Sequence, residues 1–266
     1  MEHLFKAWQD FCKDYRAADH ILLLSDYDGT LATIVGRPAD AVLSASVRQA
    51  LQALAGKSKI NVGVISGRSI DELKSLVGIE DIYYSGNHGL EIEGPGLRYI
   101  HPQAEAARAM MKDLAAQLAK ALRHIDGVII QEKGLSVSVH YRLVKPEKED
   151  AVTSAVKRIT TPYVDKGEIR VYPMKKDWEI RPPINWDKGR AVEFIGQEIK
   201  ANLKLSHLLT IYPGDDTTDE DAFRFVQRPA GWSIYVGGEK ASSAAEYYLN
   251  SVGEVEEFLN RLIKLK

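Results

Sequence analysis

The stretch Ile21–Thr30, which reads ILLLSDYDGT, decides the fold. Its first half, Ile21–Ser25, is a short apolar run that stops at acidic residues, which is typical of a buried strand in a parallel sheet. Asp26 and Asp28 follow two positions apart, so in an extended segment both carboxylates point to the same side. Gly29 permits a sharp turn there. Because open α/β sheets bind ligands outside the carboxyl ends of their strands, we predict a functional site at this point.

Strands alternate with helices on both sides of this stretch. The segments that carry the pattern include the strands Ile60–Ile65 and Leu208–Tyr212 and the helices Val42–Leu54 and Asp187–Lys200. Residues 103–181 differ, because they predict a helix–hairpin–helix–hairpin unit. We therefore expect a doubly wound parallel-sheet, Rossmann-like α/β core of residues 1–102 and 182–266, with an inserted α+β cap domain at 103–181.

Composition excludes several classes of protein. The 266 residues carry 35 Lys+Arg and 37 Asp+Glu, a net charge of −2, which argues against a nucleic-acid binder with a bulk basic surface. The one cysteine, Cys12, allows no intrachain disulfide and no Cys-based zinc site, and it fits a reducing compartment. The longest apolar runs are too short to span a bilayer. We expect a cytoplasmic monomer without nucleic-acid or membrane partners.

A second acidic stretch, Gly214–Asp221 (GDDTTDED), follows the strand Leu208–Tyr212. Part of its acidity is explained by helix formation. Thr217 and Glu220 predict a capping box, while Asp219 and Asp221 complement the dipole of the helix that begins there.

Asp215 and Asp216 precede this helix and are not needed for capping. Together with Asp26 and Asp28 they place two acid clusters at the ends of two strands. Oxygen ligands of this kind favour Mg²⁺, so the sequence predicts a magnesium site.

The stretch Ser66–Arg68 follows the strand Ile60–Ile65 and opens a helix, for which Ser69 and Glu72 predict a capping box. A hydroxyl and backbone N–H groups at a helix N-terminus form a phosphate site, although an ordinary helix cap explains the same residues. Lys188 lies in the first turn of a helix, where a cation opposes the dipole. Its presence there indicates another role, such as binding an anion.

The order of these motifs resembles that of the haloacid dehalogenase-like phosphohydrolases. More specific segments resemble the trehalose-6-phosphate phosphatase family. They are YSGNHGLEIEG (84–94), SVHYR (138–142), WEIRPPINWDKG (178–189) and YPGDDTTDEDAF (212–223). The resemblance covers residues from about 20 to 250 and implies the free-standing form, without the synthase-like domain that some members carry.

The resemblance implies a Mg²⁺-dependent phosphatase that hydrolyses trehalose 6-phosphate in the last step of trehalose biosynthesis. Asp26 would be the nucleophile that forms an aspartyl-phosphate, and Asp28 would be the general acid and base. Mg²⁺ would bind Asp26, the backbone carbonyl of Asp28 and Asp215, with Asp216 nearby. The groups expected at the phosphate are the catalytic residues Ser66 and Lys188 together with Thr30, Gly67 and Arg68.

Sugar recognition is expected from both parts of the chain. The candidates are Glu132, Lys133, Arg142, Lys176 and Glu179 in the insertion and Asn87, His88 and Glu91 in the core. A carboxylate accepts two hydrogen bonds, which suits the vicinal hydroxyls of a sugar. Structural interpretations stand beside these, because Glu132 and Lys133 also fit a hairpin corner and Glu179 fits a strand surface.

Three alternatives stay open at this point. The same chemistry could act on another sugar phosphate, such as sucrose phosphate or a glucosylglycerol-type phosphate. A glycosyltransferase could use Asp26 and Asp28 to hold a metal and a sugar nucleotide, but it has no use for Lys188 or Ser66. A non-catalytic sugar-phosphate sensor would need neither the nucleophile nor the acid.

Overall fold

The computed structural model describes residues 1–265, which divide into two compact units. The core unit joins Met1–Tyr99 to the residues from Trp186 onward, and the insertion unit is Ile100–Asn185. Each unit has its own sheet and its own apolar core. The insertion therefore interrupts the core in sequence but folds around a separate sheet.

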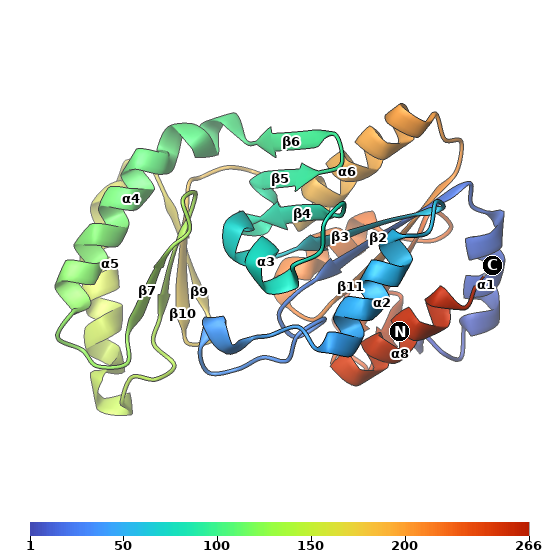
Figure 1. Ribbon diagram of the computed structural model, residues 1–266. Coiled ribbons are helices and arrows are strands. Elements are labelled where there is room, and N and C mark those ends of the chain that lie inside the picture. Colours follow the sequence, from blue (N-terminus) through green and yellow to red (C-terminus); the bar gives the residue numbers. More distant parts are fainter. Residues whose placement is uncertain (266) are drawn as a thin grey trace. The chain divides into compact units, whose positions relative to one another are not determined.

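A nine-stranded sheet forms the middle of the core unit, in the order β1-β13-β12-β11-β2-β3-β4-β5-β6 (Figure 1). Neighbouring strands from β1 to β4 run parallel, and β5 runs antiparallel to β4. The strands are β1 (Glu2–His3), β2 (His20–Asp26), β3 (Ile60–Ile65), β4 (Tyr83–Gly86), β5 (Glu91–Gly94), β6 (Leu97–Ile100), β11 (Leu208–Gly214), β12 (Gly231–Val236) and β13 (Tyr247–Leu249). The predicted α/β fold with a parallel sheet is confirmed.

Strand β2 shows why helices cover both faces of this sheet. Its side chains alternate between two apolar clusters, Ile21 and Leu23 in one and Leu22 and Leu24 in the other, and all four are fully buried. A strand that is apolar on both faces needs helices on both, so the sheet is doubly wound.

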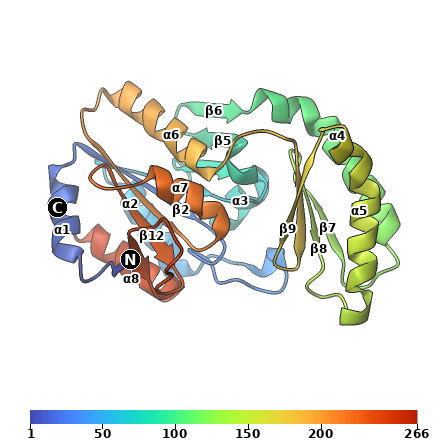
Figure 2. The same cartoon turned by 180° about the vertical axis from the view of Figure 1, so that it is seen from behind.

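The helices of the core unit divide between these two clusters. On the face of Ile21 lie α1 (Trp8–Ala17), α2 (Ala45–Ala55), α3 (Ile70–Val77) and α8 (Val252–Ile263), and on the face of Leu22 lie α6 (Lys188–Leu203) and α7 (Glu220–Phe225). Figure 2, from behind, shows α6 and α7 in front of the sheet.

Side-chain caps mark where four of these helices, α2, α3, α6 and α8, begin. The prediction that a helix starts at Val42 is wrong by three residues, because the Ser44 hydroxyl accepts a hydrogen bond from the Val47 backbone and α2 begins at Ala45. Asp187 caps α6 through Arg190 N in the same way.

The insertion unit is an antiparallel four-stranded sheet, β7-β8-β10-β9, covered on one face by two helices. Its elements are α4 (Pro102–Leu122), β7 (Ile129–Glu132), β8 (Val137–His140), α5 (Glu149–Asp165), β9 (Arg170–Met174) and β10 (Asp177–Arg181). Val137, Val139 and Ile180 point toward the helices and are fully buried. The alternate positions, including Ser138 and Glu179, form a polar opposite face.

None of the helices formed by residues 1–265 combines the length and the apolar character needed to cross a lipid bilayer.

Gly63 in the central strand β3 tests the packing of the sheet. A Cβ there would lie 2.6 Å from Leu24 Cδ2 and 2.9 Å from the Tyr83 carbonyl oxygen, so Gly63→Ala is expected to lower the free energy of unfolding by about 1–3 kcal/mol. The control is Gly196→Ala in α6, where the nearest atoms lie 3.7 Å away and helix propensity predicts a gain of about 0.5–1 kcal/mol. Urea unfolding followed by circular dichroism measures both. A Gly63→Ala variant as stable as the parent would contradict the packing argument.

Candidate active site

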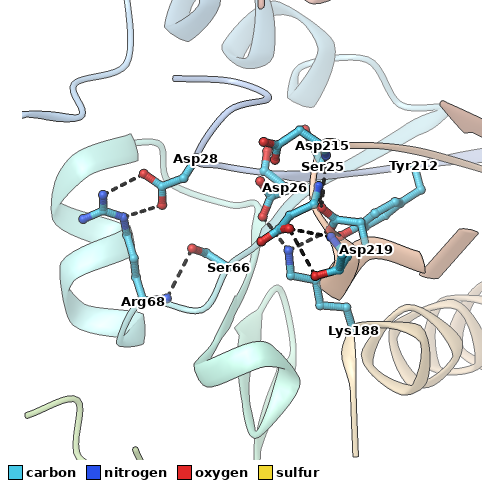
Figure 3. A network of polar contacts seen from close by, with 11 residues as sticks. Ser25, Asp26, Asp28, Ser66, Arg68, Lys188, Tyr212, Asp215 and Asp219 are labelled. Atoms are coloured by element: carbon cyan, nitrogen blue, oxygen red, sulfur yellow. Dashed lines mark hydrogen bonds and ion pairs between the residues drawn. The ribbon is translucent and has the colours of Figure 1, made fainter. Parts of the chain in front are cut away.

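The predicted catalytic residues lie at one edge of the core sheet (Figure 3). Asp26 ends β2, Ser66 follows β3, and Asp215 follows β11. These three strands are adjacent and parallel, so their carboxyl ends meet at the same edge. Sequence positions almost 200 residues apart are thereby brought together.

Lys188 joins two carboxylates at this edge. Its Nζ lies 2.6 Å from Asp26 Oδ1 and 2.7 Å from Asp219 Oδ1, and all three side chains are buried. Lys188 is the first residue of α6, so its cost against the helix dipole is offset by two charge-assisted hydrogen bonds. In this structure the role indicated by its position is to hold the Asp26 carboxylate.

Asp219 corrects the prediction made for the second acidic stretch. The sequence assigns it only to the helix dipole, but its side chain in the first turn is also fully buried. Oδ1 also accepts a hydrogen bond from Tyr212 Oη at 2.7 Å, while Oδ2 accepts the backbone N–H groups of Asp215 and Asp216. The capping box is therefore made by Asp216 and Asp219, not by Thr217 and Glu220.

Sequence reasoning missed Asp219 as a member of the site, and it did not consider Tyr212. The signal was present in the excess of acid, because the five acids of DDTTDED (215–221) exceed what one helix cap requires.

Asp26, Asp215 and Asp219 form a carboxylate cluster whose ligand oxygens lie within 4.8 Å of one another. Three carboxylates against one ammonium, that of Lys188, leave a net charge of −2 if all are ionised. Asp215 Oδ1 is buried and receives no hydrogen bond from any of residues 1–265. A divalent hard cation would neutralise this charge and use this oxygen, so the residues fit such a cation.

The pKa values of the cluster express the same excess of negative charge. Burial raises the pKa of Asp26 well above its usual value, and Asp219 and Asp215 raise it further against the lowering effect of Lys188. Burial and Asp219 also raise the pKa of Asp215 to about 7. Burial lowers the pKa of Lys188, but Asp219 and Asp26 raise it above its usual range. The ammonium is therefore charged, and the carboxylates need additional positive charge to be fully ionised.

Asp28 is bound by Arg68, a residue that the sequence assigned to the substrate. Arg68 Nε and Nη2 each donate to the Asp28 carboxylate at 2.7 Å, and Nη1 pairs with Glu72. Arg68 also donates to the Pro38 carbonyl, and its side chain is 7% exposed, whereas that of Asp28 is 37% exposed. The structure therefore makes Arg68 a partner of Asp28. Ser69 caps α3 as predicted, but the Glu72 carboxylate goes to Arg68.

The remaining core candidates surround the Ser66–Arg68 loop. Ser66 and Thr30 are buried, and Ser66 Oγ accepts the Arg68 N–H at 3.2 Å. A Cβ on Gly67 would lie 2.4 Å from His88 Nε2, so only glycine leaves room for the imidazole. Asn87, His88 and Glu91 lie in the turn and strand that face this loop.

Two of the five candidates in the insertion unit meet in its polar face. Lys133 Nζ lies 3.0 Å from Glu179 Oε2, and both side chains are buried. Ser138 Oγ donates to the same oxygen, and Arg181 Nε lies 3.5 Å from Glu179 Oε1. Burial alone raises the pKa of Glu179, but Lys133 and Arg181 lower it below its usual value, so the carboxylate is ionised.

The other three candidates are directed elsewhere. Glu132 pairs in register with Val137, so it belongs to the helix side of the sheet, and its carboxylate accepts the Gly134 N–H. Lys176 pairs with Glu149 of α5, and Arg142 donates to the Lys175 carbonyl. All three are at least partly exposed.

The polar face holds further residues that the sequence did not single out. Gln131 and Ser138 face Glu179, and His140 faces Asp177 across β8 and β10. His140 bridges Gln131 Oε1, 3.0 Å from Nε2, and Asp177 Oδ1, 3.4 Å from Nδ1. The one-residue difference between Glu132 and Gln131 decides which side chain shares a face with Glu179.

A parallel α/β core with an aspartate at the end of a central strand, a buried lysine and a second acid cluster defines a phosphohydrolase of the haloacid dehalogenase-like class. A family model described as trehalose-phosphatase matches residues 24–252. The chain is 34% identical over 256 residues to probable trehalose-phosphate phosphatase D of Arabidopsis thaliana, covering 92% of this chain and 68% of that protein. It is 33% identical to trehalose 6-phosphate phosphatase RA3 of Zea mays, covering 92% and 70%. The chain therefore belongs to the trehalose-phosphatase family and is a phosphoric monoester hydrolase.

Solved structures agree on the fold. A trehalose-6-phosphate phosphatase of Aspergillus fumigatus matches with a TM-score of 0.63 and 27% identity, covering 97% of both chains. The C-terminal domain of a C. albicans trehalose-6-phosphate phosphatase matches with a TM-score of 0.79 at 23% identity, again over 97% of both. The C-terminal domain of a Candida albicans trehalose synthase regulatory protein also matches, with a TM-score of 0.68 at 13% identity, over 95% of this chain and 97% of that one. At these last two identities the likeness shows the fold alone.

Asp177 gives the insertion unit a pH-dependent stability. Burial and then the Glu179 carboxylate raise its pKa from 3.8 to about 6. A raised carboxyl pKa favours the folded state most below pH 3.8, and that advantage is lost as the pH rises through about 6. Asp177→Asn is therefore expected to match the parent near pH 3.5 and to be more stable at pH 7.5 by about 1–3 kcal/mol. Thermal unfolding across this range measures the difference, and a constant difference at all pH values would contradict the assignment.

Proposed function

We propose that the protein hydrolyses trehalose 6-phosphate to trehalose and phosphate, as the last step of trehalose biosynthesis in the cytoplasm, with Mg²⁺ as its metal. Family membership supports the substrate, and the observation that carries the chemistry is the buried Asp26 held by Lys188 beside Asp215 and Asp219. The proposed partner is the sugar phosphate alone, and the monomeric state stays a prediction.

In the first proposed step, Asp26 attacks phosphorus in line. A bond forms between its free carboxylate oxygen and phosphorus, and the bond from phosphorus to the sugar oxygen breaks. Lys188 holds the other Asp26 oxygen and so fixes the direction of attack. Asp28 gives its proton to the departing sugar oxygen, which requires release from Arg68. Ser66 and the backbone at Thr30 bind the phosphoryl oxygens.

In the second proposed step, Asp28 takes a proton from water, which attacks the phosphorus of the aspartyl-phosphate and frees Asp26. A Mg²⁺ ion held by Asp26, the Asp28 carbonyl and Asp215 would supply positive charge against which carboxylate and phosphate can approach. Asp219 stays with Lys188 and the backbone of Asp215, so it orients both.

The insertion unit is proposed as the substrate-specificity domain. Its polar face carries Glu179 with Lys133, and a buried carboxylate of this kind accepts hydrogen bonds from sugar hydroxyls. The same fold occurs in a regulatory protein, so the fold does not separate an enzyme from a sensor. The presence of Asp26, Asp28 and Lys188 supports the enzyme.

Phosphate release from a panel of sugar phosphates, with and without Mg²⁺, tests the proposal. Trehalose 6-phosphate is expected to be the best substrate, with sucrose phosphate and a glucosylglycerol phosphate as comparisons. Asp26→Asn removes the nucleophile and a metal ligand together, so turnover is expected to fall below about one per cent of the parent. Retained turnover in that variant would exclude the covalent route, and a different best substrate would reassign the specificity.

Glu179 and Glu132 form a matched pair for the specificity domain. Glu179→Gln breaks the ion pair with Lys133 on the polar face, so kcat/KM for trehalose 6-phosphate is expected to fall about 10–1,000-fold, or about 1.4–4 kcal/mol. Glu132→Gln alters the helix side of the sheet and keeps an acceptor for Gly134, so it is expected to change kcat/KM by less than about threefold. Neither change should affect p-nitrophenyl phosphate. Equal losses on both substrates for Glu179→Gln would make that residue structural.

A further inference from the structure

A turn of unusual backbone conformation lies against the Ser66–Arg68 loop. Asn87, His88 and Gly89 have φ values of 48°, 56° and 103°, so three successive residues occupy the left-handed half of backbone space. Only glycine adopts this region without cost, and side chains held there are found where the surrounding structure imposes them. Contacts with the surrounding structure must therefore stabilise this backbone conformation.

The conformation directs two adjacent backbone N–H groups of the turn at the same loop. Asn87 N donates to the Arg68 carbonyl at 2.7 Å, and His88 N donates to the Ser66 carbonyl at 2.9 Å. The two accepting carbonyls flank Gly67, whose missing side chain makes room for the His88 ring. In an ordinary strand successive N–H groups point in opposite directions, so this convergence depends on the left-handed conformation.

Glu91 connects the turn to the start of α3 by hydrogen bonds. Its Oε1 accepts Asn87 Nδ2 at 2.7 Å and the backbone N–H of Ile70, the first residue of α3, at 2.9 Å. Glu91 is 8% exposed and Asn87 is fully buried. Because Ile70 follows the loop within two residues, one carboxylate oxygen connects the turn packed against the loop to the helix that begins just after it. The loop is thus held at both ends.

Two catalytic functions depend on where this loop lies. Ser66 is placed to bind the phosphate, and Arg68 holds Asp28 through two hydrogen bonds of 2.7 Å. We propose that Glu91 and Asn87 are positioning residues that hold the Ser66–Arg68 loop in place. They thereby set the position of the Ser66 hydroxyl and, through Arg68, the position from which Asp28 is released during the reaction. This inference rests on the proposed function, and it replaces the expectation that Glu91 and Asn87 serve mainly to read the sugar.

The two interpretations of Glu91 predict different kinetics. A sugar ligand affects only substrates that carry the sugar, mainly through KM. A residue that positions the loop affects the phosphoryl transfer of every substrate, mainly through kcat. Values of kcat and KM measured in parallel for trehalose 6-phosphate and p-nitrophenyl phosphate distinguish the two interpretations.

The variants are Glu91→Ala, Glu91→Gln and the control Glu93→Ala. Glu93 lies two residues along the same strand and also contacts α3, but through Lys74 near the far end of the helix. Glu91→Ala is expected to lower kcat about 10–100-fold on both substrates, with KM changed less than about threefold. Glu91→Gln retains an oxygen acceptor and is expected to recover most of that loss, and Glu93→Ala should stay within about threefold of the parent. Inhibition by inorganic phosphate, which reports the Ser66 site directly, should weaken in Glu91→Ala alone.

Several results would overturn the proposal that Glu91 positions the loop. A loss confined to trehalose 6-phosphate and to KM makes Glu91 a sugar ligand, and an equal loss in Glu91→Gln removes the hydrogen-bond argument. A lower unfolding temperature with unchanged kcat makes Glu91 merely structural. If Glu91→Ala does not fold, Asn87→Gly tests the same contact, because glycine keeps the backbone conformation and removes the Nδ2 donor to Glu91. Unchanged kcat in that variant overturns the proposal. A parent that prefers another sugar phosphate would fail the proposed substrate, yet the p-nitrophenyl phosphate comparison would still decide the role of Glu91.

Discussion

The catalytic edge depends on one buried ammonium placed between two carboxylates. Lys188 holds Asp26 by a charge-assisted hydrogen bond and stabilises the fully buried Asp219, and neither carboxylate could occupy its position without a compensating charge. Asp219 in turn orders the backbone of Asp215 and Asp216. Removing the ammonium would leave buried like charges close together, so this interaction organises the ends of two strands and the start of two helices.

A second pair of opposite charges, Arg68 and Asp28, lies near the first. Arg68 binds the Asp28 carboxylate at two points and is itself fixed by Glu72 and the Pro38 carbonyl. Asp26 and Asp28 are thus held by separate cations from separate segments of chain. In the proposed mechanism this separation allows Asp28, which has the more exposed side chain, to leave Arg68 while Asp26 keeps its contact with Lys188.

The sequence predicts the fold and most of the residues at the catalytic edge for a simple reason. In a parallel sheet, motifs that follow strands meet at one edge whatever the length of chain between them, so Asp26, Ser66 and Asp215 could be grouped without coordinates. Asp219 could not, because a local explanation, the dipole of the helix that begins there, already accounted for an acid at that position. The choice between Glu132 and Gln131 depended on hairpin register, where a slip of one residue exchanges the two faces. The partner of Arg68 lies 40 positions away, and no spacing rule reveals it.

The two strands that pair with β2 come from parts of the sequence that are far apart, which affects folding during synthesis. Its partner on one side, β3, lies in the same part of the sequence, but its partner on the other, β11, begins only at Leu208, beyond the whole insertion. Until that strand has been synthesised, one edge of β2, whose apolar residues 21–24 are fully buried in the folded chain, is open to pairing with other chains. A shortened chain that ends before β11 would expose this edge permanently. The insertion folds around its own sheet, whereas the core sheet is complete only when strands from both sides of the insertion are present.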